Sequence, residues 1–207
     1  YSLRMDVTER LWIDAASRID VSARGYTDNR TLGNTTTGGA TGGSGGSYGG
    51  LGRDARSGTA NWTYGDYRNP NELGSGGAGD GSSGAGSGGG LVRLTVSEAV
   101  IDGAILANGG QGTYVWYEHY RGAGSGGGIR LDADSLSGEG WISANGGNSD
   151  GNGGGSGGGG RVAVYYQTSD FDVAHITAHA GTGGQGTAAV GTTYIKDAAG
   201  AGELRVD

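Results

Sequence analysis

Short segments in which apolar and polar residues alternate recur along the chain. This period-two pattern is typical of a β-strand with one buried face. The segments form two sets that follow each other in pairs, and a stretch rich in Gly comes after each pair. The upstream set comprises residues 11–15, 92–96, 129–133, 162–166 and, more weakly, 193–197. The downstream set comprises residues 21–25, 105–109, 142–146, 176–180 and, in the last copy, 204–206.

The spacing within the pairs is nearly constant. The gap from one segment to the next is 9 residues in two copies (96 to 105 and 133 to 142) and 10 in another (166 to 176), but 6 in the first (15 to 21). Upstream segments start at 11, 92, 129, 162 and 193, so the steps are 81, 37, 33 and 31 residues. Two strands per unit, repeated in one direction, predict an all-β fold, a right-handed parallel β-solenoid of about five coils.

The dipeptides Asn108-Gly109 and Asn145-Gly146 favour a different arrangement. Asn-Gly is a common two-residue turn of antiparallel hairpins, which a β-sandwich would contain. Because both dipeptides occur at the same position of the repeat, we interpret them as solenoid corners.

Glycine makes up 51 of the 207 residues, and there is one Pro. The chain has no strict Gly-X-Y period, which excludes collagen, and Gly costs about 1 kcal/mol per helical site relative to Ala. The long first step of the repeat predicts that residues 26–90 hold either a long Gly-rich excursion or an unrecognised coil. We expect residues 1–207 to form a single β-solenoid domain with ordered Gly-rich loops in a polyglycine-II-like packing, because Gly has no Cβ.

Charge and cysteine content restrict the function. The net charge is −7 and the pI is about 4.8, which leaves no basic surface for nucleic acid or anionic lipid. The absence of Cys excludes disulfides, thiolate chemistry and Cys-ligated zinc. No run approaches the roughly 18 apolar residues of a membrane span. The chain opens at Tyr1 without a signal peptide, so we expect a processed form or an excised domain.

Four segments carry a family resemblance: residues 73–77, 143–147, 157–166 and 202–207. With the two-strand repeat, they make the chain similar to the glycine-rich parallel β-helix regions of bacterial secreted and cell-surface proteins. The resemblance implies a scaffold that is secreted or lies on the cell surface, and it supplies no catalytic residue.

Two aromatic clusters, residues 62–70 and 114–120, lie outside the predicted strands. Exposed Tyr and Trp beside polar residues suit stacking on sugar rings. Alternatively, the rings cover the open edge of the glycine layer or a contact between subunits. The candidate ligand-binding residues are Trp62, Tyr64, Tyr67, Tyr114, Trp116, Tyr117 and Tyr120.

Outward side chains at equivalent positions of a solenoid stack in rows across the strands. The resulting mixed surface is either a binding face or a solvated sheet face with weak cross-strand pairs. One predicted row is Trp12, Arg93, Arg130, Ala163 and Tyr194, and the next is Asp14, Thr95, Asp132, Tyr165 and Lys196.

Catalysis has little support in the sequence. Glycosidases use two carboxylates about 5–9.5 Å apart, and Asp132 and Asp134 would face the same way. However, strand alternation produces such pairs freely, and no apolar surroundings are predicted that would raise one pKa for acid catalysis. We assign no catalytic residue and expect a protein that is not an enzyme. A glycoside hydrolase or a polysaccharide lyase is the remaining enzymatic alternative.

Metal binding is also weakly indicated. His175 and His179 would share one strand face, but two His without Cys make a poor zinc site. We expect the corner residues Asn108 and Asn145 to bond backbone groups rather than a metal. Residues 148–153 offer oxygen ligands for Ca²⁺ but match neither an EF-hand loop nor a calcium-binding nonapeptide repeat. No metal site and no cofactor are assigned, with Ca²⁺ as the weak alternative.

The two ends of the chain, residues 3–7 and 203–207, are both alternating segments. Solenoid ends expose unpaired strand edges, and no capping helix is predicted. We expect these edges to pair end to end between copies, in a contact that propagates into a fibre. The alternative is a segment of a longer solenoid whose neighbours are missing.

These features together favour an extracellular structural or adhesive module, which is a fibre subunit or part of a large surface protein. Adhesion would run through the two aromatic loops, with glycan as the partner. The alternative is a carbohydrate-binding domain of a polysaccharide-degrading enzyme.

Overall fold

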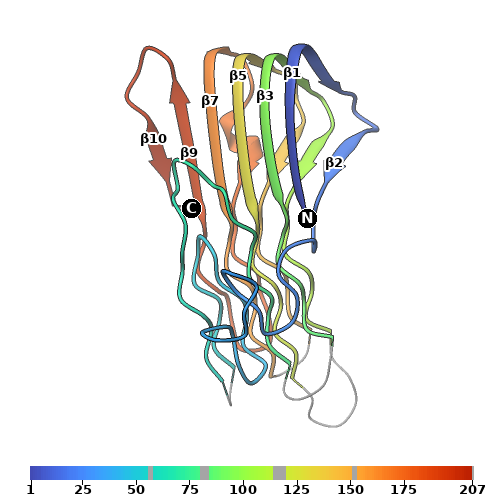
Figure 1. Cartoon of the computed structure of the whole chain (residues 1–207), viewed down its shortest axis with the longest axis vertical. Coiled ribbons are helices and arrows are strands. Elements are labelled where there is room, and N and C mark those ends of the chain that lie inside the picture. Colours follow the sequence, from blue (N-terminus) through green and yellow to red (C-terminus); the bar gives the residue numbers. More distant parts are fainter. Residues whose placement is uncertain (56–57, 80–83, 114–119, 151–152, 207) are drawn as a thin grey trace.

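The computed structural model describes residues 1–55, 58–79, 84–113, 120–150 and 153–206. Its upper half in Figure 1 consists of β-strands, and its lower half of extended Gly-rich segments. The larger sheet has the strand order β1-β3-β5-β7-β9-β10. Its strands are β1 (Ser2–Ile13), β3 (Leu91–Ile101), β5 (Gly128–Ser137), β7 (Arg161–Ser169), β9 (Thr192–Asp197) and β10 (Glu203–Arg205).

The smaller sheet has four short parallel strands in the order β2-β4-β6-β8. Each follows a strand of the larger sheet in the chain, so the two sheets face each other across the core. The strands are β2 (Arg18–Asp20), β4 (Ala104–Leu106), β6 (Trp141–Ser143) and β8 (Ile176–Thr177). The helical content of the described residues is one 3₁₀ turn, η1 (Val173–His175).

The core is built from the inward residues of both sheets. In β3 burial alternates along the strand, as the period-two pattern requires. Each fully buried Val, Leu or Ile stabilises the fold by about 1.5–3 kcal/mol relative to an exposed one. The fully buried members are Val92, Leu94, Ile101, Ile129, Leu131, Leu136, Val162 and Val164 from the larger sheet and Ile105 and Ile142 from the smaller one.

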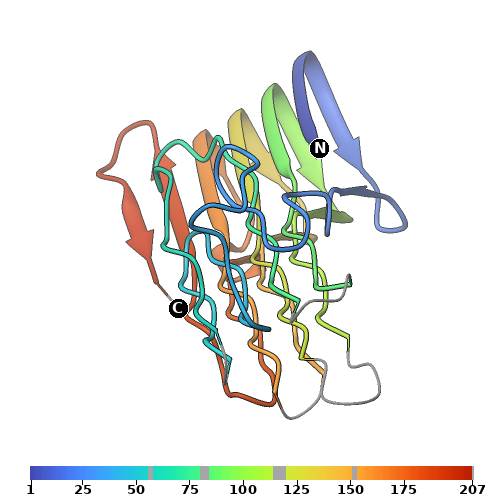
Figure 2. The same cartoon turned by 60° about the horizontal axis from the view of Figure 1, so that its bottom comes forward.

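The Gly-rich half is held by hydrogen bonds between extended segments that run side by side below the sheets (Figure 2). For example, the Gly46 N–H donates to the Ala123 carbonyl, and the Gly158 N–H donates to the Gly46 carbonyl, both at 2.9 Å. A Cβ on Gly124 would lie 2.0 Å from the Ser87 carbonyl oxygen. Segments this close require Gly, which explains the composition of this half.

The prediction of a right-handed parallel β-solenoid of about five coils is wrong. The chain forms a six-stranded, mostly parallel sheet and a four-stranded parallel sheet with almost no helix. Three findings separate it from uniform coils. The sheets are unequal, β10 runs antiparallel to β9, and the described part of residues 21–90 contributes no named strand. The Gly-rich segments that join each strand of the smaller sheet to the next strand of the larger sheet form an irregular layer of their own.

The predicted strand register holds from the second copy onward. Arg93, Arg130, Ala163 and Tyr194 are Cα partners in successive strands, and so are Thr95, Asp132, Tyr165 and Lys196. The first strand was misaligned, because β1 contains two alternating segments separated by a bulge between Val7 and Arg10. Arg4 rather than Trp12 pairs with Arg93, and Asp6 rather than Asp14 pairs with Thr95.

The last predicted strand was also misplaced. Residues 204–206 were expected to form the downstream strand of the last copy of the repeat. Instead Leu204 pairs with Tyr194, and β10 folds back on β9 as an extra strand of the larger sheet. A segment this short carries no pattern that fixes its direction.

Candidate functional site

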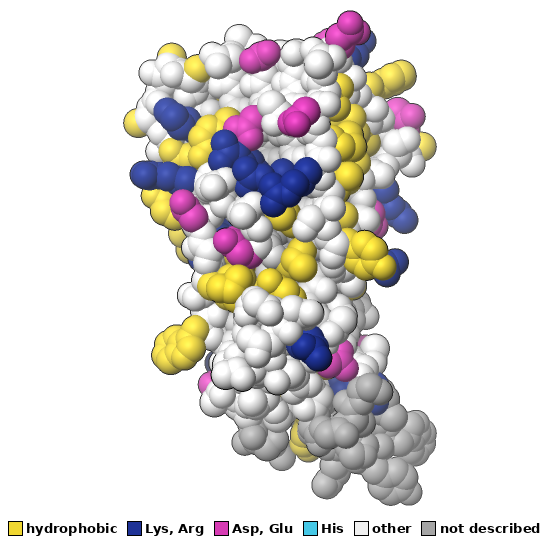
Figure 3. All heavy atoms as spheres, in the orientation of Figure 1, with side chains coloured by type: hydrophobic (Ala, Val, Ile, Leu, Met, Phe, Trp, Pro, Cys, Tyr) yellow, Lys and Arg dark blue, Asp and Glu magenta, His cyan; other side chains and the backbone are white. Residues whose placement is uncertain are grey.

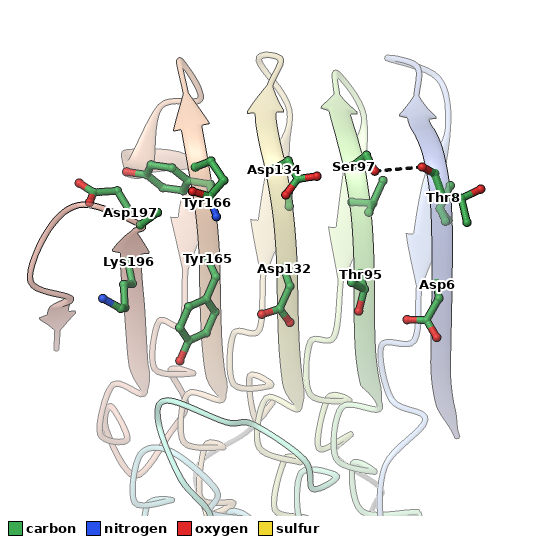
Figure 4. A pocket seen from close by; sticks show the side chains of 15 residues that line it. Asp6, Thr8, Thr95, Ser97, Asp132, Asp134, Tyr165, Tyr166, Lys196 and Asp197 are labelled. Atoms are coloured by element: carbon green, nitrogen blue, oxygen red, sulfur yellow. Dashed lines mark hydrogen bonds between the residues drawn. The ribbon is translucent and has the colours of Figure 1, made fainter.

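Two adjacent rows of outward side chains cross the larger sheet at right angles to its strands (Figure 4). Two residues along a strand span about 6.7 Å, so the rows are the two walls of a groove. The first row is Asp6, Thr95, Asp132, Tyr165 and Lys196, one from each of five neighbouring strands. The second row is Thr8, Ser97, Asp134 and Gln167.

The groove follows a level at which the strand pairing is interrupted. In β3 the alternation of burial slips by one residue at Ser97 and Glu98, and burial resumes at Ala99. The ladder between β3 and β5 likewise passes from Val96 to Glu98 without a Cα partner at Ser97. Between β5 and β7, Asp134 and Gln167 are likewise left without Cα partners. In β1 the register shift against β3 leaves one extra residue between Val7 and Arg10, and such a residue bends a strand and re-aims its side chains.

The groove has a volume of about 550 Å³, within the range of small-molecule sites. Its floor is the strand backbone at the inward residues Val7, Val96, Ala133 and Tyr166. Five strands at a spacing of about 4.8 Å give it a length of about 19 Å. Its shape therefore suits an extended ligand lying across the strands.

Charge in the groove is predominantly acidic. Asp6, Asp132, Asp134 and Asp197 line it together with one amine, Lys196. Arg130 compensates Asp132 through two hydrogen bonds, from Nε at 2.7 Å and from Nη2 at 2.8 Å. These bonds raise the pKa of Arg130 above its usual value. The carboxylates away from this pair give the groove its negative character.

Tyr165 is fixed in the wall of the groove. Its hydroxyl donates to the Arg68 carbonyl at 2.7 Å, and the Arg130 guanidinium lies 4.7 Å from its ring centroid. Burial raises the pKa of the Tyr165 phenol above its usual value. A ring held in this way can contact a ligand with little loss of side-chain freedom on binding.

The groove is bordered on its lower side by a row of three arginines, which hold residues 62–72 on the sheet. Arg93 donates to the Asn69 side chain at 2.9 Å and to the Pro70 carbonyl at 2.6 Å, and Arg130 reaches the same Asn69 side chain at 2.8 Å. The third, Arg4, donates to the Asn71 side chain at 2.7 Å. Figure 3 shows basic and acidic side chains close together over this part of the surface.

The first aromatic cluster is not an exposed platform. Trp62 is 86% exposed. By contrast, the Tyr64 hydroxyl is buried and donates to the Leu73 carbonyl at 2.6 Å. Tyr67 is half-buried, and its ring meets the ring of Tyr194 edge-on, with centroids 5.5 Å apart. Of this cluster, only Trp62 offers a free aromatic face of the kind that the sequence predicted.

The second aromatic cluster lies mostly outside the described residues. This applies to the candidates Tyr114, Trp116 and Tyr117. Tyr120 is described and half-buried, and its side chain packs closely against Gly43 and Gly153. Of the described candidates, Tyr64, Tyr67 and Tyr120 each pack against other parts of the chain.

The corner asparagines bond backbone groups, as predicted. Asn108 Oδ1 accepts from the Asn145 N–H at 2.8 Å, and Asn145 Oδ1 accepts from the His179 N–H at 2.7 Å. Asn148, in the weak Ca²⁺ candidate, caps Thr182 N–H in the same way at 2.9 Å. Within the described ranges, no group of three or more His, Asp or Glu is placed to hold a metal ion. Residues 151 and 152 of that candidate lie outside the described residues.

The sequence predicted ligand binding on the two aromatic loops rather than in this groove. The sequence placed Thr95, Asp132, Tyr165 and Lys196 in one outward row. That row was interpreted as either a binding face or a solvated sheet face. Asp6, Thr8, Ser97 and Gln167 were not considered. The available signal was the slip in alternation after Val96 and Ala133, where two non-buried residues follow each other in both strands.

No protein-family model, no curated protein and no solved structure matches this chain. The similarity to glycine-rich surface proteins therefore rests on residues alone. Among the described residues, no helix is long and apolar enough to cross a membrane.

Proposed function

We propose that this chain is an extracellular adhesive module, and that it binds an extended glycan in the groove across the larger sheet. The observation that carries this proposal is the groove itself. It crosses five neighbouring strands, and in the four from β1 to β7 it lies at the level where their pairing is interrupted.

The groove has the chemistry that sugar hydroxyls need. Thr95 and Ser97 offer hydroxyls, Gln167 offers an amide, and Asp134 offers a carboxylate acceptor. The ring of Tyr165, which has the Arg130 guanidinium over one face, adds apolar surface to the groove wall beside which a sugar ring can pack. All of these groups come from strands of one sheet, so they are already arranged before the ligand arrives.

The acidic charge narrows the ligand class. The groove contains three further carboxylates, of Asp6, Asp134 and Asp197, and one amine, of Lys196. The carboxylate of Asp132 is paired with Arg130. Inside the groove these carboxylates would repel a polyanionic glycan, although Arg4, Arg93 and Arg130 lie along its lower border, whereas a neutral or amine-bearing glycan would meet no such repulsion. The proposed ligand is therefore a neutral or amine-bearing polysaccharide.

A secreted or cell-surface location fits this role. The Gly-rich half adds length without adding side-chain chemistry, as a spacer in a surface protein would. The same groove would also serve a carbohydrate-binding domain attached to a polysaccharide-degrading enzyme. Neighbouring sequence distinguishes the two, since a hydrolase or lyase domain supports the second.

Affinity electrophoresis through gels that contain neutral, amine-bearing or acidic polysaccharides tests the proposal. The chain is expected to be retarded by a neutral or amine-bearing polymer and not by an acidic one. Asp134→Ala and Gln167→Ala should each weaken retention about tenfold, because each removes a hydrogen bond to the ligand. Trp62→Ala is the matched control and should bind like the wild-type chain.

The opposite pattern would contradict the proposal. If Trp62→Ala abolishes retention while both groove variants bind normally, the site lies on the aromatic loop. If none of the polymers retards the wild-type chain, the glycan assignment is wrong.

A further inference from the structure

Strand β1 forms an open edge of the larger sheet. In the part of the chain that the structure describes, β3 pairs with one side of β1, and no strand pairs with the other. β1 has 12 residues, whereas β10, at the opposite edge, has 3. A long unpaired edge presents a row of backbone donors and acceptors to a further strand.

The apolar side chains of β1 are incompletely covered. Leu3, Met5 and Val7 are only partly buried, although they point toward the core. Their partners in β3, which has a strand on each side, are Val92, Leu94 and Val96, with exposed fractions of 0%, 1% and 4%. One more strand beside β1 would complete the burial of these side chains.

The other end of the stack is closed. β10 covers β9, and Ile195 of β9 is only 6% exposed. Pairing β1 of one copy with β10 of another, as end-to-end assembly would need, could use only the three residues of β10. Most of β1 would stay unpaired in such a fibre.

We propose that β1 pairs antiparallel with β1 of a second copy, around a two-fold axis at Met5. In this register Leu3 lies opposite the partner's Val7, so apolar residues meet on the inner face. Arg4 lies opposite the partner's Asp6 on the outer face, and the symmetry makes this pair twice. Opposite charges directly across an antiparallel pair are favourable, and like charges are not.

Registers with the two-fold axis at another residue of the segment 3–7 do not combine apolar pairs on the inner face with opposite charges on the outer face. An axis at Arg4 or at Asp6 places two like charges directly opposite each other. An axis at Val7 places Arg4 opposite Arg10. An axis between two residues would put inward side chains opposite outward ones, which mismatches the two faces of the joined sheet. The axis at Met5 is thus selected by charge and by side-chain direction together.

This dimer goes beyond the proposed glycan binding. The two-fold axis is perpendicular to the sheet, so both grooves open on the same face of the joined sheet. A dimer could then hold one polymer or one surface at two points, which increases avidity without a new contact. The dimer itself does not depend on whether the groove binds glycan.

Disulfide cross-linking of the full chain tests the register. The chain has no Cys, so one introduced Cys gives an unambiguous product. Met5→Cys would oppose itself at a Cα distance of about 4.5–5.5 Å, which suits a disulfide. Mild oxidation should convert most of it into a species of twice 20.5 kDa. Leu3→Cys is the matched control, since its copies would lie about 13 Å apart along the strands.

Sedimentation velocity over a concentration series tests the same contact without a disulfide. The wild-type chain should reach a dimer and stop there. Asp6→Arg should weaken the dimer about tenfold, because it places like charges opposite each other twice. Adding Arg4→Asp to that variant restores opposite charges and should restore the dimer.

Three results would overturn the proposal. One is a wild-type chain that stays monomeric at every concentration. Another is growth into open-ended filaments, which would support end-to-end pairing through residues 3–7 and 203–207. The third is equal cross-linking of Met5→Cys and Leu3→Cys. If a monomeric chain binds glycan, the proposed function is supported and only the dimer proposal is contradicted.

Discussion

The Tyr64 hydroxyl donates to the Leu73 carbonyl and shares a hydrogen bond with the Ser75 hydroxyl at 3.0 Å. Its ring lies 4.9 Å from the ring of Tyr48, which is fully buried. These two tyrosines anchor residues 62–72 to the Gly-rich half. An aromatic residue in a polar loop can thus be a structural anchor, and the sequence alone does not distinguish that role from ligand binding.

Stability should fall at alkaline pH because of these tyrosines. Burial raises the pKa of Tyr64 and of Tyr48 above the usual value of 10.0. Above about pH 10, the unfolded chain releases protons that the folded chain keeps, so the free energy of unfolding decreases as pH rises. Below that pH the contribution is fully present.

Urea denaturation at neutral pH and at about pH 11 measures this effect. Tyr64→Phe should be about 1 kcal/mol less stable at neutral pH, because it loses hydrogen bonds, but should lose less stability on going to high pH. Tyr1→Phe is the matched control, since the Tyr1 side chain is 78% exposed. An identical alkaline loss in Tyr64→Phe and the wild-type chain would contradict the account.

The strands differ in how far they could be predicted. β3, β5, β7 and β9 pair in the expected register, because their apolar residues recur at matching positions of the repeat. β1 carries two alternations around a bulge, and a pattern of period two cannot tell which of them pairs with β3.

The Gly-rich half and the groove could not be predicted from alternation. The Gly-rich half is held by backbone hydrogen bonds, which leave no trace in the order of apolar and polar residues. The groove arises where the alternation slips after Val96 and Ala133, so it lies at the point where the pattern stops being informative.

The Gly-rich segments should be intolerant of even one methyl group where backbones touch. Gly124→Ala would place a Cβ 2.0 Å from the Ser87 carbonyl oxygen and should cost about 3 kcal/mol, because the backbone must move. Gly33→Asn is the matched control, since Gly33 has a φ of 81° and open space around it, and Asn tolerates this conformation. Thermal unfolding of both variants gives the comparison. Equal stability of the two would mean that the segments do not pack as closely as described.

At the scale of the whole molecule, the two sheets and the Gly-rich layer form a frame that fixes one polar groove. Strand residues form both walls of the groove, and residues 62–72 lie on the same face along its lower border. Its residues come from positions as far apart in the sequence as Asp6 and Lys196. Such a site exists only in the folded chain, which explains why no local sequence motif predicted it.

The most direct test of the proposed function is a titration of the isotopically labelled chain with a soluble neutral oligosaccharide, followed by amide NMR. The account predicts that the shifted signals belong to the groove, at residues 6–8, 95–97, 132–134 and 165–167. Signals from Trp62 and its neighbours should stay in place. Shifts confined to residues 62–70, or no shifts with either neutral or amine-bearing oligosaccharides, would contradict the account.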